Sequence, residues 1–428
     1  MVDQPLARAS AVATAPAPAL DHLPEHGSAV GMRTWAAMRS RAFRFYWGSS
    51  MAQMGAMNVQ QMVQPWLVYE ITGSSAMLGA ASLAGAIPML ALSPLGGYLA
   101  DRFPKKNLLM VGQAASVVLA LVLGVGITLG FVSAPLLLVA AALQGASMAI
   151  MMPARQAMVV EIVPRKDLSN AVALNNTGMN ANRVMAPAFT GFLIAVLGPA
   201  SGYYVTAVLF VIAALMTAQL PKSPASGGRE GFLQQMGGAV TYVRDDRTIL
   251  AILMVTLGGV LLSMPYMALL PAFAKEVLAV GPLHLGLLMT ASGVGALVAS
   301  LAIASMRDHN RGLWYLGSML LLGVALVGFT LSHSYALALL FIVPIGIGQA
   351  GRMAYSNILV QAYVQDGYRG RVMSFFMMEF GLTSLSTFAV ALLADAVGIA
   401  WALGATGALL VVFTLAAYRL VPRLARLQ

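Results

Sequence analysis

The sequence predicts an all-α integral membrane protein with twelve transmembrane helices, arranged as two pseudo-symmetric bundles of six. The 428 residues are 59% hydrophobic and only 9% charged, with a mean hydropathy of +0.80. Globular domains carry about 25% charged residues, so the exterior must face lipid. Apolar runs long enough to cross a bilayer recur along the chain, and the basic residues between them fall on alternate connections.

Six expected spans precede a polar stretch and six follow it. Each contains roughly 20 apolar residues, the length that crosses a hydrocarbon core. The expected spans are 46–69, 77–99, 107–130, 134–153, 168–197, 200–220, 248–274, 283–305, 312–332, 335–356, 370–394 and 398–420. The chain then divides into an N-terminal bundle (41–220), a cytoplasmic linker (221–247), a C-terminal bundle (248–421) and a short cytoplasmic tail (422–428).

The first 40 residues are expected to form a disordered cytoplasmic tail. They are rich in Ala and Pro and lack the charged start and apolar run of a cleaved signal peptide. The two bundles resemble each other at an offset of about 200 residues, since Arg41-Ala-Phe-Arg44 precedes the first span and Arg244-Asp-Asp-Arg247 precedes the seventh. Repeats of this kind surround a binding site at the membrane midplane in secondary transporters.

The basic residues indicate how the chain is oriented. With both termini in the cytoplasm, all but two of the 25 Lys and Arg residues lie inside, as the positive-inside rule requires. Lys275 is the one outside, and Arg183 is the only one expected at mid-span. The net charge of +10 therefore reflects membrane orientation, and nucleic-acid binding is not expected because no soluble domain carries a basic patch.

Several chemistries are excluded or unsupported by composition. There is no cysteine, so disulfides and cysteine metal sites are excluded. The five histidines are scattered, and no P-loop or nucleophile elbow is present. We expect no cofactor, no metal and no enzymatic activity.

A loop motif follows the second expected span, Gly97-Tyr-Leu-Ala-Asp101-Arg102-Phe-Pro-Lys105-Lys106. Gly97 would allow close helix approach, and Asp101 could accept hydrogen bonds from the N-terminal amides of another helix. Arg102, Lys105 and Lys106 would hold the loop in the cytoplasm. The motif resembles the Gly-x-x-x-Asp-Arg-x-Gly-Arg-Arg signature of the major facilitator superfamily, with Pro in place of one Gly; an ordinary basic loop is the alternative.

The resemblance extends from residue 41 to about 419. It rests also on Trp66-Leu-Val-Tyr-Glu70-Ile-Thr-Gly-Ser, Pro153-Ala-Arg155-Gln156, Asn170-Ala-Val-Ala-Leu174-Asn175 and Arg369-Gly-Arg371-Val-Met373-Ser. These look like the bacterial efflux branch that contains the enterobactin exporter. The resemblance implies a monomeric protein of the bacterial inner membrane that exports small amphipathic molecules of the drug or siderophore type, by alternating access and in exchange for protons. The alternative is an importer or facilitator of a small or lipid-derived solute on the same fold.

The fifth expected span carries a second motif, Arg183-Val-Met-Ala-Pro187-Ala-Phe-Thr-Gly191. It resembles the antiporter signature Gly-x-x-x-Gly-Pro-x-x-Gly-Gly, with two glycines replaced. Small residues allow close helix packing, and Pro187 removes one backbone hydrogen bond and permits a bend. The motif favours export over import.

Ionisable groups deep in a span are costly and suggest function. Asn176, Asn180, Arg183 and Pro187 share one helix face, which is expected to line a wet cavity. Arg183 would recognise an anion or act as an electrostatic gate. The alternative is a structural arginine bonded to carbonyls of a neighbouring helix.

Two further groups are candidates for binding and coupling. Glu379 lies about 12 Å into span eleven. It would carry the coupled proton, form an internal ion pair, for which Arg183 is a candidate partner, or sit in a partly solvated position. Gln53, Gln60 and Gln64 share a face of span one and would line the cavity and bind substrate, or form hydrogen bonds between helices. Glu70 and Asp395 fall near outer helix ends, where a gating role is possible.

Overall fold

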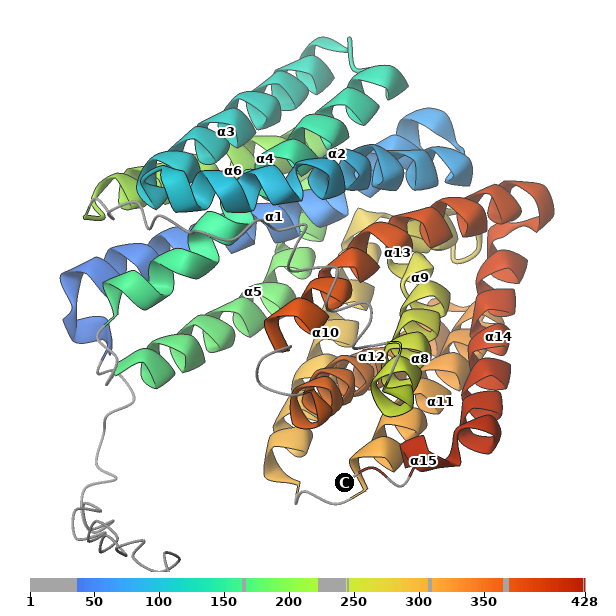
Figure 1. Cartoon of the computed structure of the whole chain (residues 1–428). Helices are drawn as coiled ribbons and strands as arrows, with labels where there is room; N and C mark the ends of the chain where they lie inside the picture. The colour runs from blue at the N-terminus through green and yellow to red at the C-terminus, as the bar shows by residue number, and fades with distance from the viewer. Residues whose placement is uncertain are drawn as a thin grey trace, which may run out of the picture.

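The computed structural model describes residues 37–163, 167–221, 244, 246–306, 310–364, 369–425 and 427. These residues form α-helices joined by short connections, and none of them is in a β-strand (Figure 1). The principal helices are α1 (Arg41–Thr72), α2 (Ser75–Arg102), α3 (Lys105–Leu129), α4 (Ala134–Ile162), α5 (Leu168–Leu197), α6 (Pro199–Ala218), α8 (Arg247–Ser263), α9 (Pro265–Glu276), α10 (Pro282–Ser305), α11 (Arg311–Thr330), α12 (Tyr335–Tyr363), α13 (Arg369–Val397) and α14 (Ile399–Leu420).

These helices coincide with the apolar runs of the sequence, with one difference. The expected seventh span is divided into α8 and α9 at Met264. Pro265 is the first residue of α9, because proline has no N–H to donate to the preceding turn and its fixed φ suits the first helical position. The helix is therefore interrupted inside this span.

Two short helices lie in segments that the sequence assigned to tails. Ala37–Arg39 form a 3-10 helix (η1), and the Ala37 N–H donates to the Asn170 side chain at 3.1 Å. At the other end, α15 (Pro422–Ala425) follows α14, and the Gly312 N–H donates to the Leu427 carbonyl at 3.1 Å. Residues 1–36 and 222–243 lie outside the described residues, as do 164–166, 307–309 and 365–368.

Nine helices within the described ranges are long and apolar enough to cross a membrane. They are α2, α3, α4, α6, α8 with α9, α10, α11, α12 and α14. The protein is therefore a multi-pass membrane protein. α1 and α5 are as long but more polar, and the apolar described part of α13, Gly381–Val397, is shorter.

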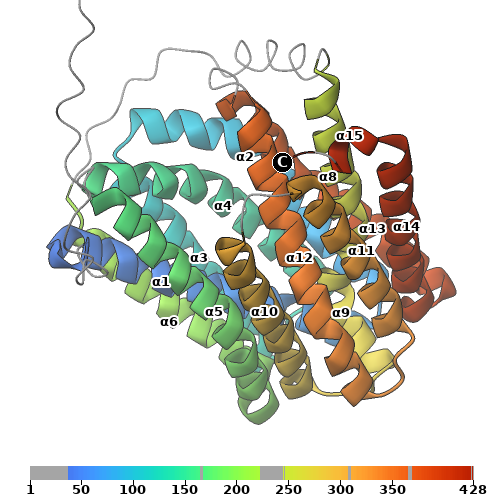
Figure 2. The ribbon, with the colours of Figure 1, turned by 90° about the horizontal axis from the view of Figure 1, so that it is seen from below.

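By chain order the helices divide into an N-terminal group, α1 to α6, and a C-terminal group, α8 to α14. In the N-terminal group, α1 to α6, α2 lies on α4 while α6 lies on α1 and α3. In the C-terminal group, α8 to α14, α12 lies on α10 and α11, and α14 lies on α11. The groups meet where α2 contacts α13, where α5 contacts α10, and where α9 contacts α1 and α2. Figure 2 shows the α5–α10 contact, with the two helices side by side.

The two ends of the molecule differ in charge and in contacts. The end that carries the connections α1–α2, α5–α6, α9–α10 and α13–α14 is called the closed end, because contacts between the two groups extend from there. Among the described residues it carries one lysine, Lys275, next to Glu276. The other end is called the basic end, because Arg41, Arg102, Arg247, Arg311 and Arg419 lie there among others.

The turns at the closed end repeat between the groups. Gly198 joins α5 to α6 with φ 79° and ψ 170°, and Gly398 joins α13 to α14 with φ 92° and ψ 148°. Both positive φ values favour glycine. The two glycines are 200 residues apart, which matches the internal offset seen in the sequence.

Candidate functional site

A carboxylate of one group caps a helix of the other at the closed end. Asp395, near the end of α13, accepts hydrogen bonds from the Ser75 N–H at 2.7 Å, the Ala76 N–H at 3.1 Å and the Ser74 hydroxyl at 2.7 Å. These groups form the N-terminus of α2, where backbone N–H groups lack intrahelical partners and the helix dipole favours negative charge. Asp395, assigned to an outer helix end from the sequence, thus joins α13 to α2.

A second cross-group contact lies beside it. The Tyr69 hydroxyl of α1 donates to Glu276 of α9. The ammonium group of Lys275 lies 5.9 Å from the centre of the Tyr69 ring, a cation–π geometry. Deeper along α2 and α13, the Ser82 and Ser384 hydroxyls are 3.1 Å apart.

The antiporter-like motif of α5 forms the other seam. A side chain at Gly191 would clash with the Pro282 carbonyl, and one at Gly286 would clash with the Pro187 carbonyl. The small residues of the motif therefore do permit close helix packing, as expected, and Gly286 of α10 is their unpredicted counterpart.

The backbone of α5 is interrupted at the proline. Pro187 cannot donate to the Arg183 carbonyl. One residue further on, the Thr290 hydroxyl of α10 accepts from the Ala188 N–H at 3.1 Å and donates to the Val184 carbonyl at 2.9 Å. Those two groups would bond to each other in a regular helix. A side chain of the C-terminal group is thus inserted into the hydrogen-bond ladder of the N-terminal group.

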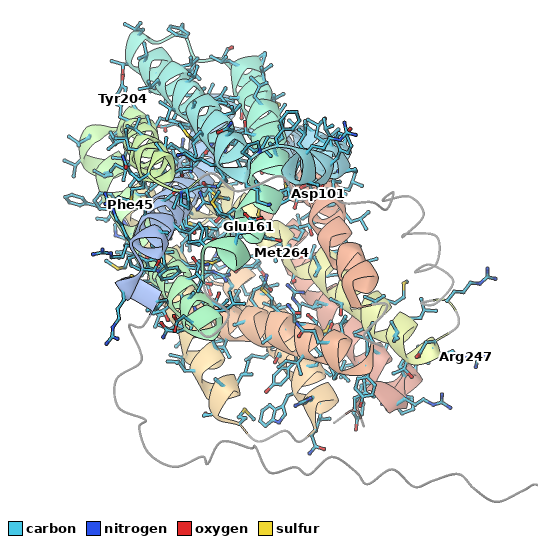
Figure 3. The ribbon with its side chains drawn as sticks, turned by 60° about the vertical axis from the view of Figure 1, so that its left-hand side comes forward. Phe45, Asp101, Glu161, Tyr204, Arg247 and Met264 are labelled. Atoms are coloured by element: carbon cyan, nitrogen blue, oxygen red, sulfur yellow. The ribbon has the colours of Figure 1, made fainter. Side chains whose placement is uncertain are left out.

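The loop motif at the basic end makes few cross-group contacts. Asp101, labelled in Figure 3, is exposed at the end of α2 and accepts no hydrogen bond from any residue that the structure describes. Arg102 lies over the Tyr98 ring at 4.9 Å. A Cβ at Gly97 would meet nothing within 4 Å, whereas one at Gly96 would clash with the Ala149 carbonyl. Close approach to α4 therefore occurs at Gly96, one residue before the expected glycine.

The two lysines of the motif hold the N-terminal group together. Lys105 is only 2% exposed and forms an ion pair with Glu161 at the end of α4. The ammonium group of Lys106 donates to the Ala218 carbonyl at 2.6 Å and to the Leu220 carbonyl at 2.8 Å. These carbonyls end α6, where a cation is favoured by the helix dipole. Both lysines are thus bonded to protein groups rather than simply solvated.

A buried polar cluster lies inside the N-terminal group. The Gln53 side-chain oxygen accepts from Gln113 of α3 at 3.1 Å and from Arg155 of α4. The Ser49 and Thr217 hydroxyls are 2.7 Å apart beside them. Gln53 is 3% exposed, so it makes the interhelical hydrogen bonds that were the alternative to lining the cavity; its part in substrate binding stays a prediction.

Arg155 corrects the sequence interpretation. It was counted among the cytoplasmic basic residues, yet it is 7% exposed, and its Nε and Nη1 atoms have no hydrogen-bond partner in the described structure. The Tyr46 hydroxyl donates to its carbonyl at 3.3 Å. A buried donor without a partner costs about 1–3 kcal/mol.

A second correction concerns Arg352 of α12. It too was counted as cytoplasmic, but it is 3% exposed, and its Nε donates to Gln349 at 3.4 Å. Arg183 is therefore not the only basic residue inside a span, and that expectation was wrong. Both errors arose because the two arginines lie in the halves of their helices nearer the basic end.

Arg183 and Arg352 approach one tyrosine from different groups. Tyr266 of α9 is 3% exposed, and its hydroxyl lies near Ser292 of α10. The guanidinium groups of Arg183 and Arg352 both lie close enough to interact electrostatically with its hydroxyl. Arg183 itself is exposed and has no hydrogen bond or ion pair with a described residue.

The remaining predicted site residues whose side chains the structure describes form no hydrogen bond with Arg183, Arg352 or Tyr266. Asn176 and Asn180 are exposed on α5, while Gln60 and Gln64 are half-buried on α1. None of these four side chains bonds to another described residue. Glu379 belongs to α13, but its side chain lies outside the described residues.

Comparison with known proteins identifies the family of this chain. A family model described as transmembrane secretion effector matches residues 32–426. The chain belongs to this family of major facilitator transporters. It is a transporter of the bacterial efflux type and not an enzyme, as the loop motif implied.

Curated relatives of this chain are transporters, two of which are named as efflux proteins. The staphyloferrin A transporter of Staphylococcus aureus is 25% identical over 84% of this chain and 89% of its own. The macrolide efflux protein A of Streptococcus pyogenes is 22% identical over 83% and 90%. The multidrug efflux pump Tap of Mycolicibacterium fortuitum is 26% identical over 78% and 85%.

Solved transporter structures share the fold of this chain. A mutant of the peptide transporter POT aligns with a TM-score of 0.76 at 11% identity, over 91% of this chain and 96% of the other. A bacterial homologue of the human lysosomal transporter Spinster aligns with a TM-score of 0.70 at 14% identity, over 93% and 100%.

Three features of the site were missed from sequence: Tyr266, the cluster around Arg155, and the pairing of Asp395 with α2. Arg155 and Arg352 could have been noticed because each lies inside a run of apolar residues. The partner of Asp395 could not, since Ser75 is 320 residues away along the chain.

Proposed function

We propose that this protein exports small amphipathic molecules across the bacterial inner membrane by alternating access, in exchange for protons. Twelve spans carry the movement: the nine apolar helices together with α1, α5 and α13. The last three fall short of a simple apolar criterion because α1 and α5 carry the polar residues of the transport path and α13 is described only in part. Each group of six spans acts as one bundle, and a monomer suffices.

The orientation follows from charge. The basic end faces the cytoplasm, with both termini, and the closed end faces outward. The described basic residues at helix ends support this, because Lys275 is the exception at the closed end and is offset by Glu276.

One observation carries the proposal: the contacts between the two groups begin at the closed end, and the described residues of the basic end show no counterpart to them. Asp395, Tyr69 and the α5–α10 seam hold the closed end together. Asp101, which occupies the reciprocal position at the other end of α2, is exposed and without a bond to any described residue. A state of this kind would admit substrate from the cytoplasm, and the opposite arrangement would release it outside.

Within this cycle the candidate residues have separate roles. Arg183 with Asn176 and Asn180, and the glutamines of α1, would contact substrate. Gly97, Asp101, Arg102 and the Pro187–Gly191 seam would govern opening and closing. Glu379 would carry the proton, since a carboxyl group within a span is more easily protonated when it is desolvated.

The cross-group serines provide a direct test of alternating access. The chain contains no cysteine, so the double variant Ser82→Cys with Ser384→Cys introduces the only two thiols. The hydroxyls they replace are 3.1 Å apart, close enough for a disulfide to form with small adjustments. Oxidation should lock the closed end and stop transport, and dithiothreitol should restore it.

The measurement is uptake of erythromycin, of ethidium and of a dye with an anionic group, a rhodamine with a free benzoate, into inverted membrane vesicles with an imposed pH gradient. Each single-cysteine variant, treated with the same oxidant, serves as the control. Full transport by the cross-linked protein would contradict alternating access at this seam. Uptake that ignores the pH gradient would reject proton exchange, and a deletion strain with raised tolerance to toxic compounds would favour the import alternative.

A further inference from the structure

The charges buried in the helices of this protein are of one sign. Among the described side chains, those at least seven residues from a helix end that carry charge are Arg155, Arg183 and Arg352. Every described acidic side chain lies within two residues of a helix end: Glu70, Asp101, Glu161, Asp167, Asp246, Glu276 and Asp395. Even if Glu379 neutralises one arginine, two positive charges remain in the interior.

A low-dielectric interior with net positive charge attracts anions and repels cations. Neutral or cationic substrates would gain nothing from these arginines, and each arginine carries a desolvation cost that must be offset. An arginine also presents a planar fork of donors that matches a carboxylate or a phosphate. The transported molecule is therefore the best source of the negative charge that would compensate these arginines.

Arg183 is placed to make that contact. Its side chain is exposed at the middle of α5, next to the α5–α10 seam, and its carbonyl lies 3.4 Å from the Cβ position of Gly293. The hydroxyl of Tyr266, near Ser292, is close enough to interact electrostatically with Arg183. Arg352 is packed against Gly259 of α8 and fixed through Gln349, so it adds a second positive charge from the C-terminal group.

We propose that the transported molecule carries at least one negatively charged group, which binds Arg183 at the junction of the two helix groups, with buried Arg352 strengthening the positive potential there. This rests on the proposed transport function and names its substrate class. Because the two arginines belong to different groups, an anion between them favours their approach. Arg183 contacts the anion. Arg352 is a positioning residue: it does not contact the anion, and its charge raises the electrostatic potential near Tyr266.

A matched pair of dyes tests the charge requirement. A rhodamine with a free benzoate and the methyl ester of the same dye have nearly the same size and shape, but only the first has a negative charge. In inverted vesicles with a pH gradient, we expect the benzoate dye to be transported with a KM at least tenfold lower than that of the ester. Equal transport, or preference for the ester, would overturn the anion proposal while leaving proton-driven export intact.

Variants then assign the preference to a residue. Arg183→Gln should abolish it by raising the KM for the benzoate dye, Arg183→Lys should keep part of it, and Arg352→Gln should weaken it. Arg419→Gln removes one exposed arginine at the end of α14 and is the matched control. An unchanged preference in Arg183→Gln would overturn the assignment, and the wild-type dye comparison stands even if that variant is not inserted.

If vesicles take up neither dye, the compounds that overproducing cells release into the growth medium are analysed instead. Compounds that accumulate outside overproducing cells at least tenfold above vector controls should carry a carboxylate, phosphate or sulfonate. Exported compounds without an acidic group would overturn the inference alone. No enrichment of any compound would overturn the export function and this inference with it.

Discussion

The carboxylate of Asp395 accepts a hydrogen bond from the Ser75 N–H at 2.7 Å, so that the end of one helix caps the start of a helix in the other group. An oxygen acceptor at a helix N-terminus contributes about 1 kcal/mol. That energy is available only while the closed end is shut. In the proposed transport cycle this energy would favour the state that is shut at the closed end, without stabilising either group by itself.

Asp395→Ala should shift this equilibrium toward opening at the closed end by about fivefold, the factor that corresponds to 1 kcal/mol. Asp395→Asn, which keeps one acceptor oxygen, should have a smaller effect. The measurement is labelling of Ser384→Cys by a membrane-impermeant maleimide from the outside. Labelling that is no faster in Asp395→Ala would show that the cap does not hold this end.

Asp101→Asn should reduce transport severely while leaving the amount of protein in the membrane unchanged. Asp101 makes no hydrogen bond to a described residue in this state, so its loss costs the present structure little. In the opposite state we expect it to accept from the N-terminus of α13, as Asp395 does from α2. Asp167→Asn is the control, because Asp167 precedes α5 without capping it. Wild-type transport rates in Asp101→Asn would contradict the reciprocal role.

Gly286→Ala should prevent complete closure of the α5–α10 seam. Its Cβ would meet the Pro187 carbonyl, a backbone atom that cannot rotate away. Transport should fall, and Ser384→Cys should be labelled faster from the outside. Gly281→Ala, at the start of the same helix with no atom near the new Cβ, should behave as wild type. Normal activity in Gly286→Ala would mean that the seam adjusts at little cost.

Arg155→Met should leave the unfolding temperature of the purified protein unchanged or slightly higher, yet impair transport. The substitution removes two buried donors that lack partners, and each costs about 1–3 kcal/mol. Gln53 keeps its hydrogen bond from Gln113, so no acceptor is stranded. Thermal unfolding and transport are measured on the same preparation, with Arg155→Lys alongside. A large loss of stability would show that the arginine is structural.

Glu379→Gln should abolish the dependence of transport on pH while leaving exchange of substrate across the membrane. A glutamine resembles a permanently protonated carboxyl group, so substrate can still bind but no proton is carried. Uptake into inverted vesicles is compared with and without a pH gradient. If the pH profile of the variant matches that of the wild type, another group carries the proton.

The positions of the helices were predictable because a long, continuous apolar run crosses lipid as an α-helix, which pairs its own backbone N–H and C=O groups. The expected span 283–305 corresponds to α10 and 398–420 to α14, with ends differing by one residue. The division between α8 and α9 was not predicted, since hydropathy averages over a single proline. Interior charges were the other weakness: Arg155 was assigned by a rule for loops, and its burial depends on Gln53, 102 residues away.

The candidate site was predictable in part. Close packing at Gly191 followed from residue size, and its partner Gly286 required the fold. The exposed position of Arg183 at mid-helix was expected, but its relation to Tyr266 and Arg352 depends on three helices meeting. Sequence identifies which residues are costly to bury, and only tertiary contacts reveal what they are near.

The hydroxyl of Thr290, seated between Val184 and Ala188, bears on how easily the two groups can separate. When α10 withdraws, the carbonyl and N–H that it bridged are already positioned to bond directly, and Thr290 can turn to a carbonyl of its own helix. No backbone group need be left unpaired in the hydrocarbon, where water could not replace the lost partner. In the proposed transport cycle the seam could thus come apart by exchanging one hydrogen bond for another, with no net loss of backbone pairing.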